Sequence, residues 1–203
     1  MTWIKICGIT SEGALDAAVD AGADAVGFVV EPSSPRAITT AQAHTFAKRS
    51  RIRTYLVTVD RTPEEMAELA SDTGVDGVQP HGRHSSAAVD AALTMGLSVL
   101  RPVSVSAKGP QIAVDTIPSQ ALPLFDTAAS GRHGGTGTVF DWNLLPDTKR
   151  NYVLAGGLSI DNVADAIATV SPYGVDASSQ LESSQGVKDP DMIVEFINRV
   201  RST

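Results

Sequence analysis

The sequence contains a single cysteine, no long apolar run and no excess of basic residues. One cysteine cannot form an intramolecular disulfide, so nothing indicates an oxidising compartment, and no cysteine–histidine spacing indicates a zinc site. No apolar segment approaches the roughly 18 residues of a membrane span. The first residues also lack the pattern of a secretory signal. We therefore expect a cytoplasmic protein.

The charge balance is acidic, with a formal net charge of −7 and a pI near 5.0. This balance argues against a general role at nucleic acids or membrane surfaces, although a local site for a small anion remains compatible with it. Hydrophobic residues at 42% and charged residues at 19% are typical of a globular protein. Because no linker or change of composition divides the chain, we predict one domain over residues 1–203.

Eight short apolar segments of strand length recur along the chain, and helical patterns separate most of them. Their continuous apolar character indicates strands buried on both faces, as in parallel sheets. The predicted strands are 3–7, 25–30, 54–59, 75–79, 97–103, 122–126, 152–155 and 173–177. This alternation predicts an α/β fold, a single (β/α)8 TIM barrel. A doubly wound open sheet is the alternative, although the G-x-G-x-x-G turn of its dinucleotide-binding form is absent.

Several helix boundaries have sequence signals. Thr39 and Gln42 are spaced as a capping box, and a last helix is expected to begin at Asp189–Pro190. We also predict a helix capped by Ser159 and a short helical connection over 109–115. The glycine-rich connection 127–138 is typical of a mobile lid.

In such a barrel, the residues that follow each strand meet at one face. Two of them are candidates for acid–base chemistry. Cys7 is either a small core residue or a thiolate base, which would need nearby positive charge. Asp126 ends a mostly apolar strand and is either a cap for the following loop or a catalytic carboxyl group.

Other polar residues at the strand ends have simpler interpretations as well. Arg36 could pair with a substrate carboxylate, or it could be an exposed arginine bonded to a neighbouring loop. His81 is interpreted as a loop histidine, and Asp60 and Arg101 as solvated or structural charges.

Two neighbouring strand ends predict a phosphate site. Gly156 and Gly157 place backbone amides where an anion can approach a helix N-terminus, and Ser178 and Ser179 add hydroxyl groups beside them. The alternative is that the glycines serve only a tight turn. The pattern favours a phosphorylated small-molecule substrate, with a base on the first strand and an acid on the sixth. No metal or cofactor motif is present, and this pair suits an isomerisation or an elimination.

The chain also resembles a known family in motifs that are spread over its whole length and occur in the same order. They include Lys5-Ile6-Cys7-Gly8-Ile9-Thr10, residues 22–28, Ser34-Pro35-Arg36, Phe125-Asp126, residues 134–137 with 140–142, Leu154-Ala155-Gly156-Gly157-Leu158 and Val175-Asp176-Ala177-Ser178-Ser179. On these residues the sequence resembles phosphoribosylanthranilate isomerase.

The resemblance implies a (β/α)8 enzyme of tryptophan biosynthesis that works without metal or organic cofactor. It would convert N-(5-phosphoribosyl)anthranilate to 1-(2-carboxyphenylamino)-1-deoxyribulose 5-phosphate by an Amadori rearrangement. By this resemblance, Asp126 is the general acid, Cys7 is the general base and Arg36 holds the anthranilate carboxylate. The phosphate-binding residues are then Gly156, Gly157, Ser178 and Ser179. Members occur as monomers, homodimers or fusions.

Two positions depart from the family pattern. Pro80 replaces a leucine in the usual Gln-Leu-His-Gly segment, and Gln180 replaces a glycine after the serine pair. The second change restricts the backbone next to Ser179. Two other functions are compatible with the pattern: the related phosphoribosyl isomerase of histidine biosynthesis, which typically has an aspartate where Cys7 stands, and a non-catalytic barrel that binds a phosphorylated ligand.

Overall fold

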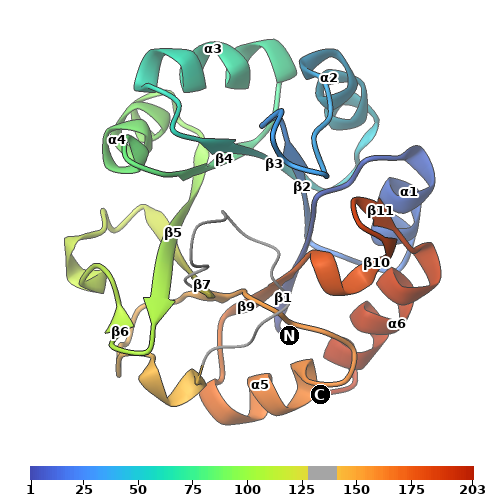
Figure 1. Ribbon diagram of the computed structural model, residues 1–203, viewed down its shortest axis with the longest axis vertical. Coiled ribbons are helices and arrows are strands. Elements are labelled where there is room, and N and C mark those ends of the chain that lie inside the picture. Colours follow the sequence, from blue (N-terminus) through green and yellow to red (C-terminus); the bar gives the residue numbers. More distant parts are fainter. Residues whose placement is uncertain (128–140) are drawn as a thin grey trace.

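The computed structural model describes residues 1–127 and 141–203, and its centre is a closed ring of parallel strands (Figure 1). β1 pairs with β2 on one side and with β9 on the other, and the pairing of β4 with β5 closes the ring. The strands of the ring are β1 Trp3–Cys7, β2 Ala25–Val29, β3 Arg53–Val59, β4 Gly77–His81, β5 Ser98–Ser106, β7 Ala121–Thr127, β8 Val153–Leu154 and β9 Gly174–Ala177.

Helices cover the outside of this ring (Figure 1). They are α1 Glu12–Asp20, α2 Thr40–Arg49, α3 Pro63–Thr73, α4 Ser85–Thr94, α5 Val163–Val170 and α6 Pro190–Arg201. The predicted (β/α)8 barrel is therefore confirmed. Closure through β4 and β5 excludes the open doubly wound sheet, which would leave two strand edges unpaired.

The predicted capping signals at α2 and α6 are confirmed. The Thr39 hydroxyl accepts a hydrogen bond from the Gln42 amide at 3.2 Å, while the Gln42 side chain accepts one from the Thr39 amide at 3.0 Å. Asp189 caps α6 by accepting from the amides of Asp191 and Met192. These bonds satisfy amide groups that the first helical turn leaves without partners.

One predicted helical segment is wrong, and one predicted helix begins later than expected. Residues 109–115 form β6 (Gly109–Pro110), which pairs antiparallel with the end of β5, and lead to the short 3₁₀ helix η1 (Val114–Thr116). Gly109 has a φ of +94°, which glycine adopts without strain, so the chain reverses there instead of starting a helix.

The helix after β8 begins at Val163 and not at Ser159. The Asn162 side chain closes a turn before it, accepting from the Ser159 amide at 2.9 Å and donating to the Gly157 carbonyl at 3.0 Å. A local side-chain bond of this kind competes with helix formation, and here it delays the helix start.

Strand alternation separates two sets of side chains. Ile4 and Ile6 on β1 point outward, into the main core between the strands and the helices. A smaller apolar cluster lies inside the barrel, and it includes Tyr55, Leu100 and Leu124. The odd-numbered residues of β1 lie on the opposite face from Ile4 and Ile6. The first strand thus sends Cys7 to the inside of the barrel.

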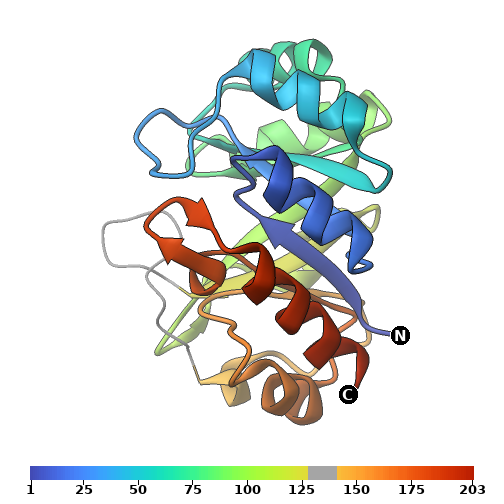
Figure 2. The same cartoon turned by 90° about the vertical axis from the view of Figure 1, so that its right-hand side faces the viewer.

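The two ends of the barrel differ. In Figure 2 both chain termini lie on the right, and the hairpin of β10 (Glu182–Ser184) and β11 (Val187–Lys188) lies on the left. This hairpin follows β9 through the 3₁₀ helix η3 (Ser179–Leu181), so it covers the carboxyl ends of the strands. Apart from Thr127, the predicted lid 127–138 lies outside the described residues; η2 (Trp142–Leu144) follows it. None of the described helices combines the length and apolar character needed to cross a membrane.

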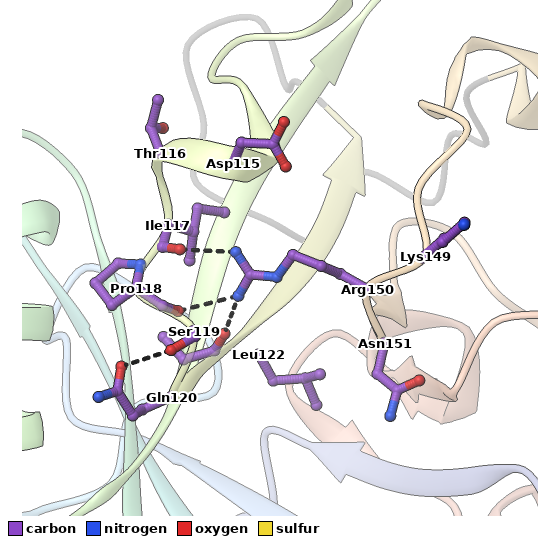
Figure 3. Close-up of a pocket in the computed structure, with 11 residues that line it drawn as sticks. Asp115, Thr116, Ile117, Pro118, Ser119, Gln120, Leu122, Lys149, Arg150 and Asn151 are labelled. Carbon is purple, nitrogen blue, oxygen red and sulfur yellow. Dashed lines mark hydrogen bonds between the residues drawn. The ribbon is translucent and has the colours of Figure 1, made fainter.

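A polar pocket lies at the opposite end, where β7 and β8 begin (Figure 3). The Arg150 guanidinium reaches across it and donates to the carbonyls of Val114, Ile117, Pro118 and Ala121 at 2.7–3.0 Å. One side chain thus satisfies four carbonyl groups of the irregular segment between β6 and β7. Arg150 has a structural role there, because its side chain donates to carbonyl groups that backbone amides would satisfy in a helix.

We predict that Arg150→Met destabilises the fold by about 1–3 kcal/mol, because four carbonyls lose a charged donor. Urea unfolding measures the change. Lys149→Met is the matched control, because Lys149 is an exposed neighbour at the same pocket (Figure 3). Equal stability of the two variants would contradict the structural role of Arg150.

Candidate active site

Lys5 and Cys7 lie two residues apart on β1 and share its inward face. Opposite Cys7 on β2 is Gly27, and a Cβ atom there would lie 2.9 Å from Cys7 Sγ and 3.2 Å from Lys5 Nζ. The missing side chain of Gly27 therefore makes the space that both groups occupy. Val29 and Val57 complete an apolar wall beside the thiol.

Lys5 is fully buried and is held by two other strands. Its Nζ donates to Asp176 Oδ2 on β9 at 2.8 Å and to Gln79 Oε1 on β4 at 2.9 Å. Burial alone would lower the pKa of Lys5, but the charges of Asp176 and Cys7 outweigh burial and raise it. Lys5 is therefore a permanent cation inside the barrel.

Cys7 is 8% exposed as a residue, and burial raises the pKa of its thiol above the ordinary value. Lys5 opposes this shift through its charge, and Lys188 opposes it more weakly through its charge. The Asp176 carboxylate acts in the same direction as burial. In the free protein the thiol form thus predominates at neutral pH, and the nearby cations favour its ionisation.

Asp126 lies on the inward face of β7 beside the turn after β8. A Cβ atom on Gly156 would lie 2.9 Å from Asp126 Oδ1 and would clash with Thr127, so only glycine allows this close approach. Burial raises the pKa of Asp126 to about 6, and the charge of Asp176 adds to the shift. A carboxyl group with this pKa keeps a protonated fraction at neutral pH, as a general acid requires.

Arg36 lies directly over the turn that follows Cys7: a Cβ atom on Gly8 would be 2.7 Å from Arg36 Cδ. Its Nε and Nη2 donate to the two carboxylate oxygens of Glu182 at 2.5 and 3.0 Å. Glu182 also accepts from Lys188 Nζ at 2.7 Å and from the Gly186 amide at 2.9 Å. The structure thus shows an arginine bonded to a neighbouring hairpin.

The predicted phosphate residues are partly brought together. Gly156 and Gly157 both have positive φ, +87° and +70°, and form the turn after β8. The Ser178 hydroxyl donates to the Cys7 carbonyl at 3.0 Å, which ties the end of β9 to the end of β1, and Ser179 begins η3. Because α5 begins only at Val163, the helix N-terminus expected directly after Gly157 is not there.

Comparison with known proteins agrees with this arrangement. The family model for N-(5'-phosphoribosyl)anthranilate isomerase matches residues 4–199. A curated relative of that name from Pseudomonas fluorescens is 44% identical, over 97% of this chain and 97% of its own. The chain belongs to the N-(5'-phosphoribosyl)anthranilate isomerase family.

Solved structures of this family have the same fold. A phosphoribosylanthranilate isomerase of Thermotoga maritima, described as monomers generated from a dimeric protein, is 30% identical with a TM-score of 0.80. A second family structure, in complex with reduced 1-(o-carboxyphenylamino)-1-deoxyribulose 5-phosphate, is 30% identical with a TM-score of 0.79. Both comparisons cover 100% of each chain. The resemblance noted in the sequence is thus confirmed.

The remaining polar groups at the strand ends are engaged in local bonds. His81 contacts Gln79 through Nε2 at 3.0 Å, and Asp60 accepts from the Arg83 amide at 2.8 Å. Arg101 donates to Ser86 and to the Pro102 carbonyl. These contacts support their interpretation as structural groups. Within residues 1–127 and 141–203, no cluster of three or more histidine, cysteine or acidic residues could hold a metal ion.

The sequence did not lead us to predict Lys5, Glu182 and Lys188 among the residues of the candidate active site. Lys5 had a usable signal, because a lysine two residues before Cys7 in an apolar strand must share its buried face. Glu182 and Lys188 had none, since the residues after Ser179 show no strand or helix pattern that places them against Arg36.

Proposed function

We propose that this chain converts N-(5'-phosphoribosyl)anthranilate to 1-(2-carboxyphenylamino)-1-deoxyribulose 5-phosphate, an Amadori rearrangement of tryptophan biosynthesis. The observation that carries the proposal is the pair of proton-transfer groups in one barrel interior. Cys7 on β1 lies beside a buried cation, and Asp126 on β7 has a pKa of about 6. Family membership supplies the substrate.

Asp126 begins the reaction as general acid. Its proton passes to the oxygen of the furanose ring, the bond between C1 and that oxygen breaks, and the nitrogen lone pair forms a protonated Schiff base. The enclosed position of the carboxyl group and the nearby Asp176 charge keep part of Asp126 protonated, which supports this role.

Cys7 acts as general base in the step after ring opening. The thiolate takes the proton from C2, and the electrons of that C–H bond move toward the Schiff-base nitrogen and give an enolamine. Return of a proton to C1 and loss of the C2 hydroxyl proton yield the ketone. The oxidation at C2 balances the reduction at C1, so no external oxidant is required.

Activity in this proposal depends on the protonation states of both Asp126 and Cys7. The productive form needs Asp126 protonated and Cys7 ionised, while the pKa of Asp126, about 6, lies below that of the thiol. Since kcat/KM reports groups of the free enzyme, it should rise up to about pH 6 and then stay level. It should fall only above the pKa of Cys7.

Substrate binding in this proposal involves both ends of the site. Glu182 occupies the Nε and Nη2 edge of Arg36, which leaves the edge formed by Nη1 and Nη2 for the anthranilate carboxylate. The amides of Gly156 and Gly157 and the hydroxyl groups of Ser178 and Ser179 would hold the phosphate. The phosphorylated compound in the related structure supports a substrate of this class.

We further propose that residues 1–203 form a single domain and act in the cytoplasm as a monomer or homodimer, without cofactor. The T. maritima relative, from which monomers were generated, makes both assembly states compatible with the family.

We predict that Cys7→Ser and Asp126→Asn each lower kcat/KM by about 100-fold or more, the range expected when a general base or acid is lost. The assay follows the loss of substrate fluorescence with freshly prepared substrate. Circular dichroism and urea unfolding of the same samples establish that the fold persists. Normal turnover by folded Cys7→Ser would exclude the thiol as the base, and absence of turnover by the unmodified chain would contradict the proposed function itself.

Arg36→Met should lower kcat/KM by roughly 10- to 100-fold, mainly through KM, because a charged pair to the substrate carboxylate is lost. Arg51→Met is the control, since Arg51 is highly exposed and pairs with Asp20 on the surface. An unchanged KM in Arg36→Met would show that Glu182, and not the substrate, is the sole partner of Arg36.

A further inference from the structure

Lys5 is a buried charged group that takes no part in the proton transfers proposed above. Lys5 lies wholly inside the barrel, on the same face of β1 as Cys7. Burying an ammonium group is costly unless partners surround it, and replacing such a pair with apolar residues often leaves stability unchanged or improved. Stability alone therefore does not explain a lysine at this position.

Two hydrogen bonds hold the Lys5 ammonium group in place. Lys5 lies opposite Asp176 in the pairing of β1 with β9, and its Nζ donates to Asp176 Oδ2 on β9 and to Gln79 Oε1 on β4. An ammonium group has three protons, and these two bonds use two of them. A Cβ atom on Gly27 would lie 3.2 Å from Lys5 Nζ and 2.9 Å from Cys7 Sγ, so the ammonium group and the thiol border the same space.

Charged groups face the thiol from three strands. Lys5 comes from β1 itself, Asp176 from β9 and Lys188 from β11. Lys188 is bound to Glu182, which also pairs with Arg36, so this carboxylate offsets only part of the Lys188 charge. Asp176 is ion-paired with Lys5 through Oδ2, and its buried Oδ1 atom has no hydrogen-bond partner in the described part of the chain. Lys5 is the one of the three that also shares the inward face of β1 with the thiol.

We propose that Lys5 is a positioning residue of the active site, whose ammonium group, fixed by Asp176 and Gln79, stabilises the thiolate of Cys7 for proton abstraction. This role rests on the proposed function, in which Cys7 is the base. Lys5 acts through Cys7, and the conversion of thiol to thiolate transfers its proton to solvent before the substrate binds.

The test measures the ionisation of Cys7 directly. Because Cys7 is the only cysteine, the ultraviolet absorbance of the thiolate reports this residue alone once the spectrum of Cys7→Ser is subtracted. We expect Lys5→Met to shift the titration midpoint upward. Simple loosening of the structure would expose the thiol and shift the midpoint downward, toward its value in the urea-unfolded chain. The two explanations thus predict opposite signs.

Lys5→Met leaves the Asp176 carboxylate unpaired and could fail to fold for that reason. The double variant Lys5→Met/Asp176→Asn removes both charges and gives a second measurement. Since Lys5 influences Cys7 more strongly than Asp176 does, the midpoint of the double variant should still lie above that of the unmodified chain, and below that of Lys5→Met. Lys108→Met, at an exposed position on the β5–β6 hairpin, should leave the midpoint unchanged.

Kinetics provide an independent measurement. In the folded Lys5 variants, the falling limb of kcat/KM should move to higher pH together with the thiol midpoint. A midpoint that stays in place or falls in both Lys5 variants would overturn the proposal. The thiolate titration needs no turnover, so the two proposals can fail separately. If the unmodified chain shows no turnover but the midpoint still rises in the Lys5 variants, the role of Lys5 in ionising Cys7 is supported and the proposed reaction is contradicted.

Discussion

The buried ion pair between Lys5 and Asp176 is the interaction on which the site depends. It joins β1 to β9 across 2.8 Å, and its two charges act on the two proton-transfer groups in opposite ways. The Lys5 cation favours the ionised form of Cys7, whereas the Asp176 anion favours the protonated form of Asp126. Each charge also acts on the other group, but Lys5 is the stronger of the two at Cys7 and Asp176 is the stronger at Asp126. The ion pair thus favours the proposed base on one strand and the proposed acid on another.

Barrel closure makes this arrangement possible. Alternation along each strand directs Lys5, Cys7, Asp126 and Asp176 into one interior, while Ile4 and Ile6 face the helices. Glycines at 27 and 156 keep that interior open beside Cys7 and Asp126. The β10–β11 hairpin adds a third element, because Glu182 orients Arg36 over the turn that follows Cys7. The candidate catalytic residues therefore lie toward the carboxyl ends of the strands, and Arg150 at the other end has a structural role.

Much of the fold was predictable because it depends on local signals. Apolar runs of strand length and helix caps such as Thr39 and Asp189 can be recognised from a few neighbouring residues. The errors arose where the Asn162 side chain forms bonds that delay α5, and where the positive φ of Gly109 lets the chain reverse. Cys7 and Asp126 could be proposed from their places at strand ends. The partners of Arg36 and Lys5 could not, because Glu182 and Asp176 lie more than a hundred residues away in the sequence and only closure brings them near.

We propose that burial raises the pKa of Asp126 on β7 far enough for part of it to stay protonated at neutral pH, in the same barrel interior as the thiol on β1. The most direct test is an NMR titration of the Asp126 carboxyl carbon in the unmodified protein, with the signal assigned by its absence in Asp126→Asn. Because burial and the Asp176 charge both disfavour the carboxylate, we expect a midpoint at a pH of about 6. A midpoint near the ordinary value of 3.8 would contradict it, since Asp126 would then be ionised throughout the neutral range.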